Sequence, residues 1–378
     1  MSALVNKLCS VAAWYFYRLF PVEKNKVVVS SFYGKGYSDN PKGIVDALLR
    51  RNANVKIVWL VKPGAEDSLP EGVTPVCYDS LRRIKELSTA KVWIDNNRKG
   101  ARIKRKNQYY LQTWHGLALK RIERDVADKL PAYYERYARR DSAQCDVIIS
   151  NCTHMTKIYR NSFWFDGEIL EYGSPRNDVL FADPTPYRKK VRDAFSLPQD
   201  RKLILYGPTF RADHSVDAYR LDCEGLRQAC HERFGGDWTV LVRLHPVVEQ
   251  LAGDLFAYDG NTICNATAFP DITELLAATD LTITDYSSLM FDFALTGRPC
   301  FQFAVDIAQY QNDRNFYFSL DKLPFPTATS NAELFQAIRS FDEAAHAARW
   351  QEFSESFGLC EDGKASERCA DWVLSHLK

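Results

Sequence analysis

Five short segments of the chain place histidine, arginine or serine directly after an apolar run. The clearest is DLTITDYSSLMFDFALTG at residues 280–297, where a β-branched run at 281–284 precedes Ser287 and Ser288, and apolar residues then continue at helical spacing. Either serine is a natural N-cap, so free backbone N–H groups and two hydroxyls would meet at the carboxyl end of a strand. That arrangement is suited to binding an anion. For this segment alone, a capped helix with nothing bound is the alternative.

The other four segments carry histidine or arginine at the same place after an apolar run. They are His115 in TWHG (113–116), Arg211 in GPTFR (207–211), Arg243 and His245 in RLHP (243–246), and Arg314 between Tyr310 and Tyr317. A histidine there can act as a general base near pH 7, and an arginine can pair with a phosphate. For any single histidine, a core or capping role is the competing interpretation. Five such strand ends in one chain are hard to attribute to packing.

Apolar strands alternate with helical patterns along almost the whole chain. We expect strands at 26–31, 55–61, 73–78, 91–95, 109–114 and 147–151, then at 202–206, 238–244, 262–265, 281–284 and 300–303. Repeated alternation of this kind predicts parallel sheets, so the expected fold class is α/β with two Rossmann-like, doubly wound domains. A ligand cleft is then expected between the domains, at the carboxyl ends of the strands. The predicted boundaries are 1–178, 179–362, and a C-terminal helix at 363–378 that crosses back.

The composition of the chain excludes several classes of protein. A hydrophobic content of 46% in 378 residues excludes global disorder. The ten cysteines show no spacing typical of metal ligands, so we interpret them as reduced thiols and expect no structural zinc. No segment reaches the apolar length of a membrane span. Residues 11–20 are apolar and aromatic but lack a cleavage site, so they indicate either a helix packed on the body or one lying in a membrane interface.

One block of the chain is strongly basic. Residues 98–140 hold 13 Lys or Arg against 4 Asp or Glu, in a chain whose net charge is only +1. Such a block points to an anionic surface or substrate, with a solvated surface loop as the alternative for 98–106. Residues 117–140 mix apolar and basic side chains at helical spacing, which predicts an interfacial membrane helix or helix pair. The predicted membrane contacts are Arg121, Arg136, Arg139 and Arg140. Nucleic acid is the competing anion, but no binding motif for it is present, so we expect no nucleic-acid partner.

An ordered set of motifs resembles the CDP-glycerol glycerophosphotransferase family, which includes teichoic-acid primases and polymerases and their relatives in capsule synthesis. The matching pieces are SFYGKGYSDNPKGI (31–44), TWHG (113–116), GSPRND (173–178), GPTFR (207–211), RLHP (243–246), ITDYSSLMFDFAL (283–295) and DGKAS (362–366). They follow the family's order and cover nearly the whole chain. Departures are Leu117-Ala118 after TWHG and Asn315 in place of a glycine, which affects the shape of the last phosphate loop.

The resemblance implies a GT-B-type fold and transfer of a polyol phosphate from a CDP-linked donor to a hydroxyl, with release of CMP. The resemblance also implies that residues 1–178 form the acceptor-side domain and that residues 179–362 form the domain that binds the donor, CDP-glycerol or CDP-ribitol. It also implies a lipid-linked polyprenyl-diphosphate glycan as acceptor, peripheral location on the cytoplasmic face of the cell membrane, and membrane contact by the segment after TWHG.

The residues themselves fit phosphoryl transfer. The nucleophile must lose a proton, and charge on the phosphoryl and leaving groups must be neutralised. His115 is the candidate base, and a protonated His245 is the second candidate catalytic residue. The predicted donor-binding residues are Pro208, Thr209, Arg211, Arg243, Thr284, Asp285, Ser287, Ser288 and Arg314. For Asp285 a structural role in orienting the turn comes first. No acidic pair is placed to hold a divalent cation on a diphosphate, so we expect no metal and no cofactor.

Three alternatives stay open at this point. The donor polyol could be ribitol, because nothing in the sequence separates it from glycerol, or a primase from a polymerase. A UDP-sugar glycosyltransferase of the same fold is a second enzyme class. A membrane-associated scaffold with a degenerate body is the third, although the presence of both histidines and three arginines argues against degeneration.

Overall fold

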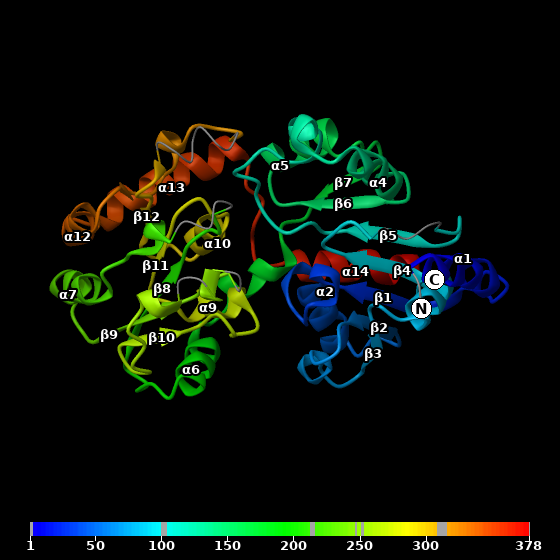
Figure 1. Ribbon diagram of the computed structural model, residues 1–378, viewed down its shortest axis with the longest axis horizontal. Coiled ribbons are helices and arrows are strands. Elements are labelled where there is room, and N and C mark those ends of the chain that lie inside the picture. Colours follow the sequence, from blue (N-terminus) through cyan, green and yellow to red (C-terminus); the bar gives the residue numbers. More distant parts are fainter. Residues whose placement is uncertain are drawn as a thin grey trace. The chain divides into compact units, whose positions relative to one another are not determined.

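The chain folds into two compact units, seen in a computed structural model that describes residues 3–99, 104–211, 216–245, 248–250, 253–307 and 316–377. Unit 1 comprises Met1–Gly116, Ile122–Asp178 and Leu359–Lys378, and unit 2 comprises Leu117–Arg121 and Val179–Gly358 (Figure 1). We predicted boundaries after 178 and 362. The chain enters the main part of unit 2 at Val179 and leaves it four residues earlier than predicted, after Gly358.

Unit 1 is built on one sheet of seven strands within the described residues, in the order β3-β2-β1-β4-β5-β6-β7. Every neighbouring pair runs parallel. The strands are β1 Glu23–Ser30, β2 Lys56–Val61, β3 Val73–Cys77, β4 Ala90–Asp95, β5 Tyr109–Gln112, β6 Val147–Ser150 and β7 Glu168–Glu171. The central strands are buried on both faces, as parallel sheets require, and their sequences are therefore continuous apolar runs.

Helices cover both faces of this sheet. They are α1 Ala3–Tyr17, α2 Asp39–Arg50, α3 Leu81–Thr89, α4 Ala132–Ser142, α5 Thr153–Ser162 and α14 Ala365–His376. Helix α14 comes from the end of the chain and packs beside α2 in the core of unit 1 (Figure 1). The Asp178 carboxylate fixes its first turn by accepting the N–H groups of Ala365 (3.0 Å) and Ser366 (2.7 Å). Trp372 and Val373 then bury their side chains with those of β1 and β2.

Unit 2 repeats the architecture with six parallel strands in the part of the chain that the structure describes, in the order β10-β9-β8-β11-β12-β13. The strands are β8 Lys202–Gly207, β9 Trp238–Val242, β10 Ile263–Asn265, β11 Leu281–Thr284, β12 Cys300–Phe303 and β13 Thr327–Ala328. The helices are α6 Thr185–Ala194, α7 Cys223–Phe234, α9 Ile272–Ala278, α10 Leu289–Ala294, α12 Asn331–Arg339 and α13 Glu343–Phe357. Asp222, Asp271, Ser330 and Asp342 cap α7, α9, α12 and α13 through their side chains.

The N-terminal helix packs on the body of unit 1 through Trp14 and exposes several other apolar side chains. The indole ring of Trp14 packs against that of Trp93 in β4, with centroids 6.5 Å apart. Tyr15, Phe16 and Leu19 nevertheless expose 65%, 54% and 81% of their surface. None of the helices in the described ranges has the length and hydropathy that crossing a bilayer requires.

Candidate active site

His115 lies three residues after the end of β5, at the carboxyl edge of the sheet of unit 1. Its Nδ1 atom is 2.8 Å from the backbone carbonyl oxygen of Asn96, to which it can donate only as N–H. That bond assigns the proton of the neutral ring to Nδ1 and leaves the lone pair on Nε2. Burial lowers the pKa of His115, although the bond to Asn96 and the charge of Asp39 act in the opposite direction. The ring is therefore neutral at pH 7, the form that a general base needs.

Three side chains behind His115 fix the position of the Asn96 segment. The Asn96 amide Nδ2 donates to Asp39 Oδ1 at 3.0 Å. Asp39 Oδ2 in turn pairs with Arg176 Nη1 at 2.7 Å, and both side chains are buried. Asn40 completes the arrangement, because its Nδ2 donates to the carbonyl of Trp114 at 3.1 Å and its Oδ1 accepts the N–H of Arg176 at 3.1 Å.

Segments 31–44 and 173–178 belong to the ordered motif set. We nevertheless predicted no site role for Asp39, Asn40, Asn96 or Arg176. The signal available was the occurrence of both segments in one ordered motif set. Their contact could not be read from the chain, because Asp39 and Arg176 are 137 residues apart.

The backbone around His115 is strained. Phe32, Tyr33, Asp39 and Trp114 all have positive φ angles, of 43°, 57°, 63° and 48°. The centroid of the Phe32 ring lies 5.7 Å from that of the His115 ring, and the Trp114 ring stacks on His115 at 4.3 Å. Each non-glycine residue in this region costs on the order of 1–3 kcal/mol and persists only where its surroundings hold it there. Four such residues next to one histidine indicate a functional site.

Gly116 allows Arg176 to approach the histidine loop, and this gives a testable prediction. Its φ is +121°, and a Cβ added there would lie 2.3 Å from Arg176 Nη2. Gly116→Ala should lower the free energy of unfolding by about 1–3 kcal/mol and reduce activity by displacing Arg176. Gly64→Ala is the matched control, since Gly64 also has a positive φ (+89°) but has no atom within 4 Å of the added Cβ. Thermal unfolding and turnover of both variants test this, and equal losses would show that the contact with Arg176 is unimportant.

In unit 2 the predicted site residues meet at the carboxyl ends of β8 and β11. The Asp285 carboxylate accepts the Thr209 N–H at 2.8 Å, the Thr209 hydroxyl at 2.6 Å and the Tyr286 N–H at 2.6 Å. The Thr284 hydroxyl donates to the carbonyl of Gly207 at 2.7 Å. Pro208 is buried between these contacts. Asp285 therefore orients the turn, which is the structural role that we preferred for it.

Arg211 does not occupy the position that we predicted for a phosphate-binding residue. Its guanidinium is buried and pairs with Asp285 at 2.8 Å and with Asp306 at 2.6 Å, while Nη1 donates to the Thr209 carbonyl at 2.6 Å. Burial lowers the pKa of Arg211, but the two carboxylates outweigh it and raise the value above the ordinary one. Arg211 thus ties three loops together. The sequence could not show this, because Asp306 lies 95 residues further along the chain.

The remaining donor residues differ in how they are held. Helix α10 is only six residues long. Ser288 occupies its N-cap position but makes no capping hydrogen bond through its side chain. Ser287 Oγ accepts the Leu289 N–H at 3.3 Å. Arg243 Nη1 donates to the carbonyls of Ala266 (3.2 Å) and Phe269 (2.5 Å). His245 is exposed, with its ring 5.4 Å from that of Phe210. Arg314 lies outside the described residues.

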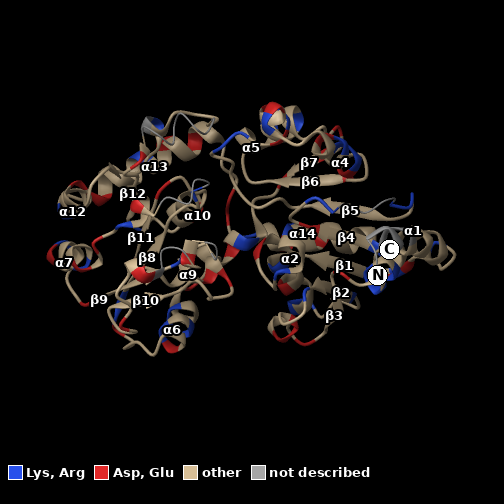
Figure 2. Ribbon diagram, in the orientation of Figure 1, with Lys and Arg blue, Asp and Glu red and all other residues tan. Residues whose placement is uncertain are grey.

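The basic segment does not form the continuous membrane helix or helix pair that we predicted for 117–140. Leu117 and Leu119 are buried, and Arg121 Nε donates to the Phe316 carbonyl at 3.3 Å within unit 2. A 3-10 stretch follows at Glu123–Lys129, and only Ala132–Ser142 is α-helical. Figure 2 shows acidic and basic residues interspersed on α4.

Arg98 and Lys99, the first two residues of the basic block, are buried, which the alternative of a solvated loop at 98–106 did not predict for them; Lys106 is exposed, and residues 100–103 lie outside the described ranges. The Arg98 guanidinium donates to Glu123 Oε2 at 2.7 Å and lies 3.4 Å from the Asp141 carboxylate, with each side chain at most 4% exposed. Burial lowers the pKa of Arg98, but the two carboxylates raise it above its ordinary value overall. Two tyrosines of α4 point into this network and not to a membrane surface, because Tyr134 donates to Glu123 and Tyr137 to the Arg98 carbonyl.

Two doubly wound parallel sheets, each with polar residues gathered at its carboxyl edge, define the GT-B class of transferase folds. The chain is similar over its whole length to a solved structure of the wall teichoic acid polymerase TagF, with a TM-score of 0.86 and 30% identity across 99% of that chain. A histidine variant of TagF soaked with CDPG gives the same TM-score over 99% of this chain. Residues 13–375 match the family model of CDP-glycerol:poly(glycerophosphate) glycerophosphotransferase, and the chain belongs to that family.

Two curated relatives support this assignment. A teichoic acid poly(glycerol phosphate) polymerase from Staphylococcus epidermidis is 33% identical over 94% of this chain, which spans about half (51%) of that relative's length. A teichoic acid glycerol-phosphate transferase from Staphylococcus aureus is 32% identical over 93% of both chains. The comparisons confirm the family, its class of enzyme and the α/β fold of two Rossmann-like units that we predicted from the sequence.

Proposed function

We propose that this chain transfers glycerol phosphate from CDP-glycerol to a hydroxyl of a lipid-linked acceptor or growing polymer and releases CMP. The observation that carries the proposal is the state of His115, a neutral histidine whose Nδ1–H is held by the Asn96 carbonyl. The names of the relatives supply the substrate class, since those at 30–33% identity are glycerol-phosphate enzymes, whereas ribitol-phosphate enzymes share 26–27%.

In the proposed reaction the acceptor hydroxyl attacks the phosphorus that bears glycerol. A new P–O bond forms, the P–O bond to the CMP phosphate breaks, and CMP leaves with the electron pair. The hydroxyl proton passes to Nε2 of His115. Arg243, a protonated His245, Arg314 and the Ser287–Ser288 turn supply the charge and hydrogen bonds that neutralise the donor phosphates. Pro208, Thr209, Thr284 and Asp285 shape that turn, and Arg211 acts on it as a positioning residue.

One assay tests the proposal directly. CMP release is measured with CDP-glycerol, CDP-ribitol and a UDP-sugar, each with a bacterial membrane extract as acceptor. We expect turnover of CDP-glycerol and little of the other two. If CDP-ribitol is turned over in preference, the transferred group is ribitol phosphate and not glycerol phosphate. If only the UDP-sugar is turned over, the protein is a glycosyltransferase and the proposed reaction is wrong.

We further propose that the protein acts as a peripheral enzyme on the cytoplasmic face of the cell membrane. Two exposed surfaces of unit 1 support this. The first is the apolar end of α1 with the turn that follows it, where Tyr15, Phe16 and Leu19 are exposed. The second is the basic side of α4, where Arg136, Arg139 and Arg140 are exposed. Arg121 is the remaining basic residue that we assign to membrane contact.

This gives a prediction for vesicle binding. Each basic group near an anionic surface contributes about 1 kcal/mol, so Arg136→Glu/Arg139→Glu/Arg140→Glu should strongly reduce flotation with anionic vesicles and remove its salt dependence. A Tyr15→Ser/Phe16→Ser/Leu19→Ser variant measures the share of α1 while keeping Trp14 on Trp93. If the α4 variant floats as well as the parent, α4 is an ordinary solvated helix.

A further inference from the structure

One face of α4 opens a pocket that the proposed reaction leaves unused. It encloses about 190 Å³ and is lined by Tyr133, Arg136, Tyr137, Arg140 and Asp141; we call it the α4 pocket. Arg136, Arg140 and Tyr133 recur at intervals of three or four residues, so they share one side of the helix. Tyr133 exposes 74% of its surface, which places an aromatic ring on the rim beside two cations.

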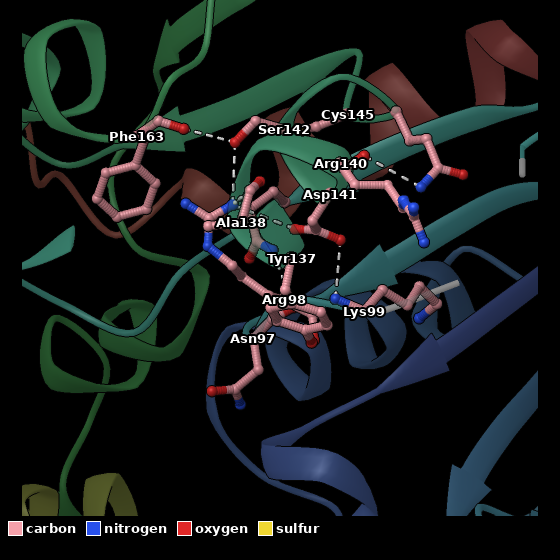
Figure 3. Close-up of polar contacts among 12 residues, drawn as sticks. Asn97, Arg98, Lys99, Tyr137, Ala138, Arg140, Asp141, Ser142, Cys145 and Phe163 are labelled. Atoms are coloured by element: carbon pink, nitrogen blue, oxygen red, sulfur yellow. Dashed lines mark hydrogen bonds and ion pairs between the residues drawn. The ribbon is translucent and has the colours of Figure 1, made fainter. Parts of the chain in front are cut away.

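Hydrogen bonds and an ion pair hold the part of the α4 pocket that Asp141 forms. Figure 3 shows the Asp141 carboxylate joined to Arg98 and to the backbone of Lys99. The Lys99 N–H donates to Asp141 Oδ1 at 2.9 Å, and Arg98 Nη1 donates to Ser142 Oγ at 2.9 Å and to the Ala138 carbonyl at 3.1 Å. These bonds anchor the inner side of the last turns of α4. The two arginines on its outer side are therefore presented from a fixed backbone.

The α4 pocket has two positively charged side chains, Arg136 and Arg140, that can bind an anion. Within the described ranges, neither Arg136 nor Arg140 makes a side-chain hydrogen bond or an ion pair. Arg139 differs, because its Nε donates to Glu135 at 2.8 Å and its guanidinium lies over the Trp164 ring at 5.3 Å. The Asp141 carboxylate is the acidic group in the lining, and Arg98 and the Lys99 N–H already engage it. Two arginines one helical turn apart around an aromatic rim suit a phosphate group.

The α4 pocket also shares an edge of the sheet with His115. The lining residue Asp141 is bonded to Arg98 and Lys99, which follow the carboxyl end of β4, and His115 follows the carboxyl end of the neighbouring strand β5. In doubly wound sheets this edge is where ligands bind. Tyr33 follows Phe32, whose ring is 5.7 Å from that of His115. Burial raises the pKa of Tyr33, and the charges of Asp95 and Asp141 raise it further.

We propose that the α4 pocket is a binding subsite for a phosphate group of the acceptor, held by Arg136 and Arg140 on the side of unit 1 that carries His115. This inference rests on the proposed function for the nature of the acceptor. It gives Arg136 and Arg140 a specific ligand in addition to general attraction to a membrane. An anionic lipid headgroup offers the same phosphate chemistry, so the experiment must separate the two sources.

The test measures binding without turnover. A soluble, lipid-free oligomer of three glycerol-phosphate units is titrated into the protein by calorimetry at fixed ionic strength, with no CDP-glycerol present. Arg136→Gln/Arg140→Gln should weaken binding at least tenfold, and Arg136→Lys/Arg140→Lys should restore only part of it, because lysine cannot form the bidentate contact. The control is Arg220→Gln/Arg339→Gln, which removes two exposed, paired arginines of unit 2 and should bind as the parent does.

Flotation with vesicles of phosphatidylcholine and phosphatidylglycerol forms the second arm. Weaker oligomer binding by the α4 variant alone supports the subsite. Equal oligomer binding by parent and α4 variant overturns it, as does an equal loss in the control, which would indicate bulk charge. If the α4 variant loses only flotation, the phosphate belongs to lipid and the acceptor assignment is wrong. Neither arm of this test uses CDP-glycerol. If the parent protein releases no CMP in the assay of the proposed function, that function is refuted, and the binding measurements still decide whether the subsite exists.

Discussion

His115→Ala is expected to lower CMP release from CDP-glycerol by a factor on the order of 10²–10⁴, the contribution of a positioned general base. The reason is that the Asn96 carbonyl accepts the Nδ1–H of His115, which leaves Nε2 to take the acceptor proton. Thermal unfolding should stay close to that of the parent, because the ring is only half-buried. His231→Ala is the matched control: this exposed histidine also contacts a backbone carbonyl, that of Gly236, but lies in α7. A folded His115→Ala variant with parental turnover would refute the assignment.

The pH dependence should follow from the same group. A base works in its deprotonated form, so activity is lost as the pH falls through the pKa of His115. Because burial lowers that pKa, the acid limb of kcat/KM should lie below pH 6.5, the ordinary value for histidine. A pH–rate profile of the parent with CDP-glycerol tests this, and an acid limb above pH 7 would contradict it.

Arg98→Ala should destabilise the protein by about 3–5 kcal/mol, since it leaves the buried carboxylates of Glu123 and Asp141 without their partner. Burial already raises the pKa of Asp141 to about 6, although Arg98 and the Lys99 N–H lower it. Removing Arg98 removes one of those two opposing interactions, so Asp141 should be protonated over a wider range of pH. Urea unfolding monitored by circular dichroism measures the loss.

Arg82→Ala is the control for that experiment. Arg82 is also paired with a carboxylate, Glu86 at 3.7 Å, but is 62% exposed, so its loss should cost at most about 1 kcal/mol. If Arg98→Ala costs no more than Arg82→Ala, the network of Arg98 does not hold α4 in place.

The sheets were predictable because their central strands are buried on both faces, and such strands stand out in the sequence as apolar runs. Among the edge strands, β3 and β10 were predicted as well, but β7 and β13 were not. In β7, Glu168–Glu171, charged residues flank a half-buried pair, and β13 is only two residues long. Neither offers a run of apolar residues, and their pairing is set by the neighbouring strand.

The position of His115 just after a strand was predictable, because a histidine that follows an apolar run is a local pattern. The ion pairs of Arg98 and Arg211 were not, since a basic residue gives no sign of which distant carboxylate it will meet. Glu123 and Asp306 decide that these arginines are buried, and they lie 25 and 95 residues away. For the same reason, a charge-rich stretch interpreted as a membrane helix proved to be partly interior.

Helix α14 has a consequence for how the protein is made. Its residues Cys369, Ala370, Trp372 and Val373 share a core with the first strand of the chain, and Asp178 caps it from the end of the N-terminal part. During synthesis the ribosome therefore releases every residue of unit 2 before unit 1 can close its core. The N-terminal strands keep apolar surface uncovered on the α2 side until about two hundred further residues have been translated. Of the two units, unit 1 begins to emerge before unit 2 but is completed after it, so its apolar surface is exposed to aggregation for longer during translation.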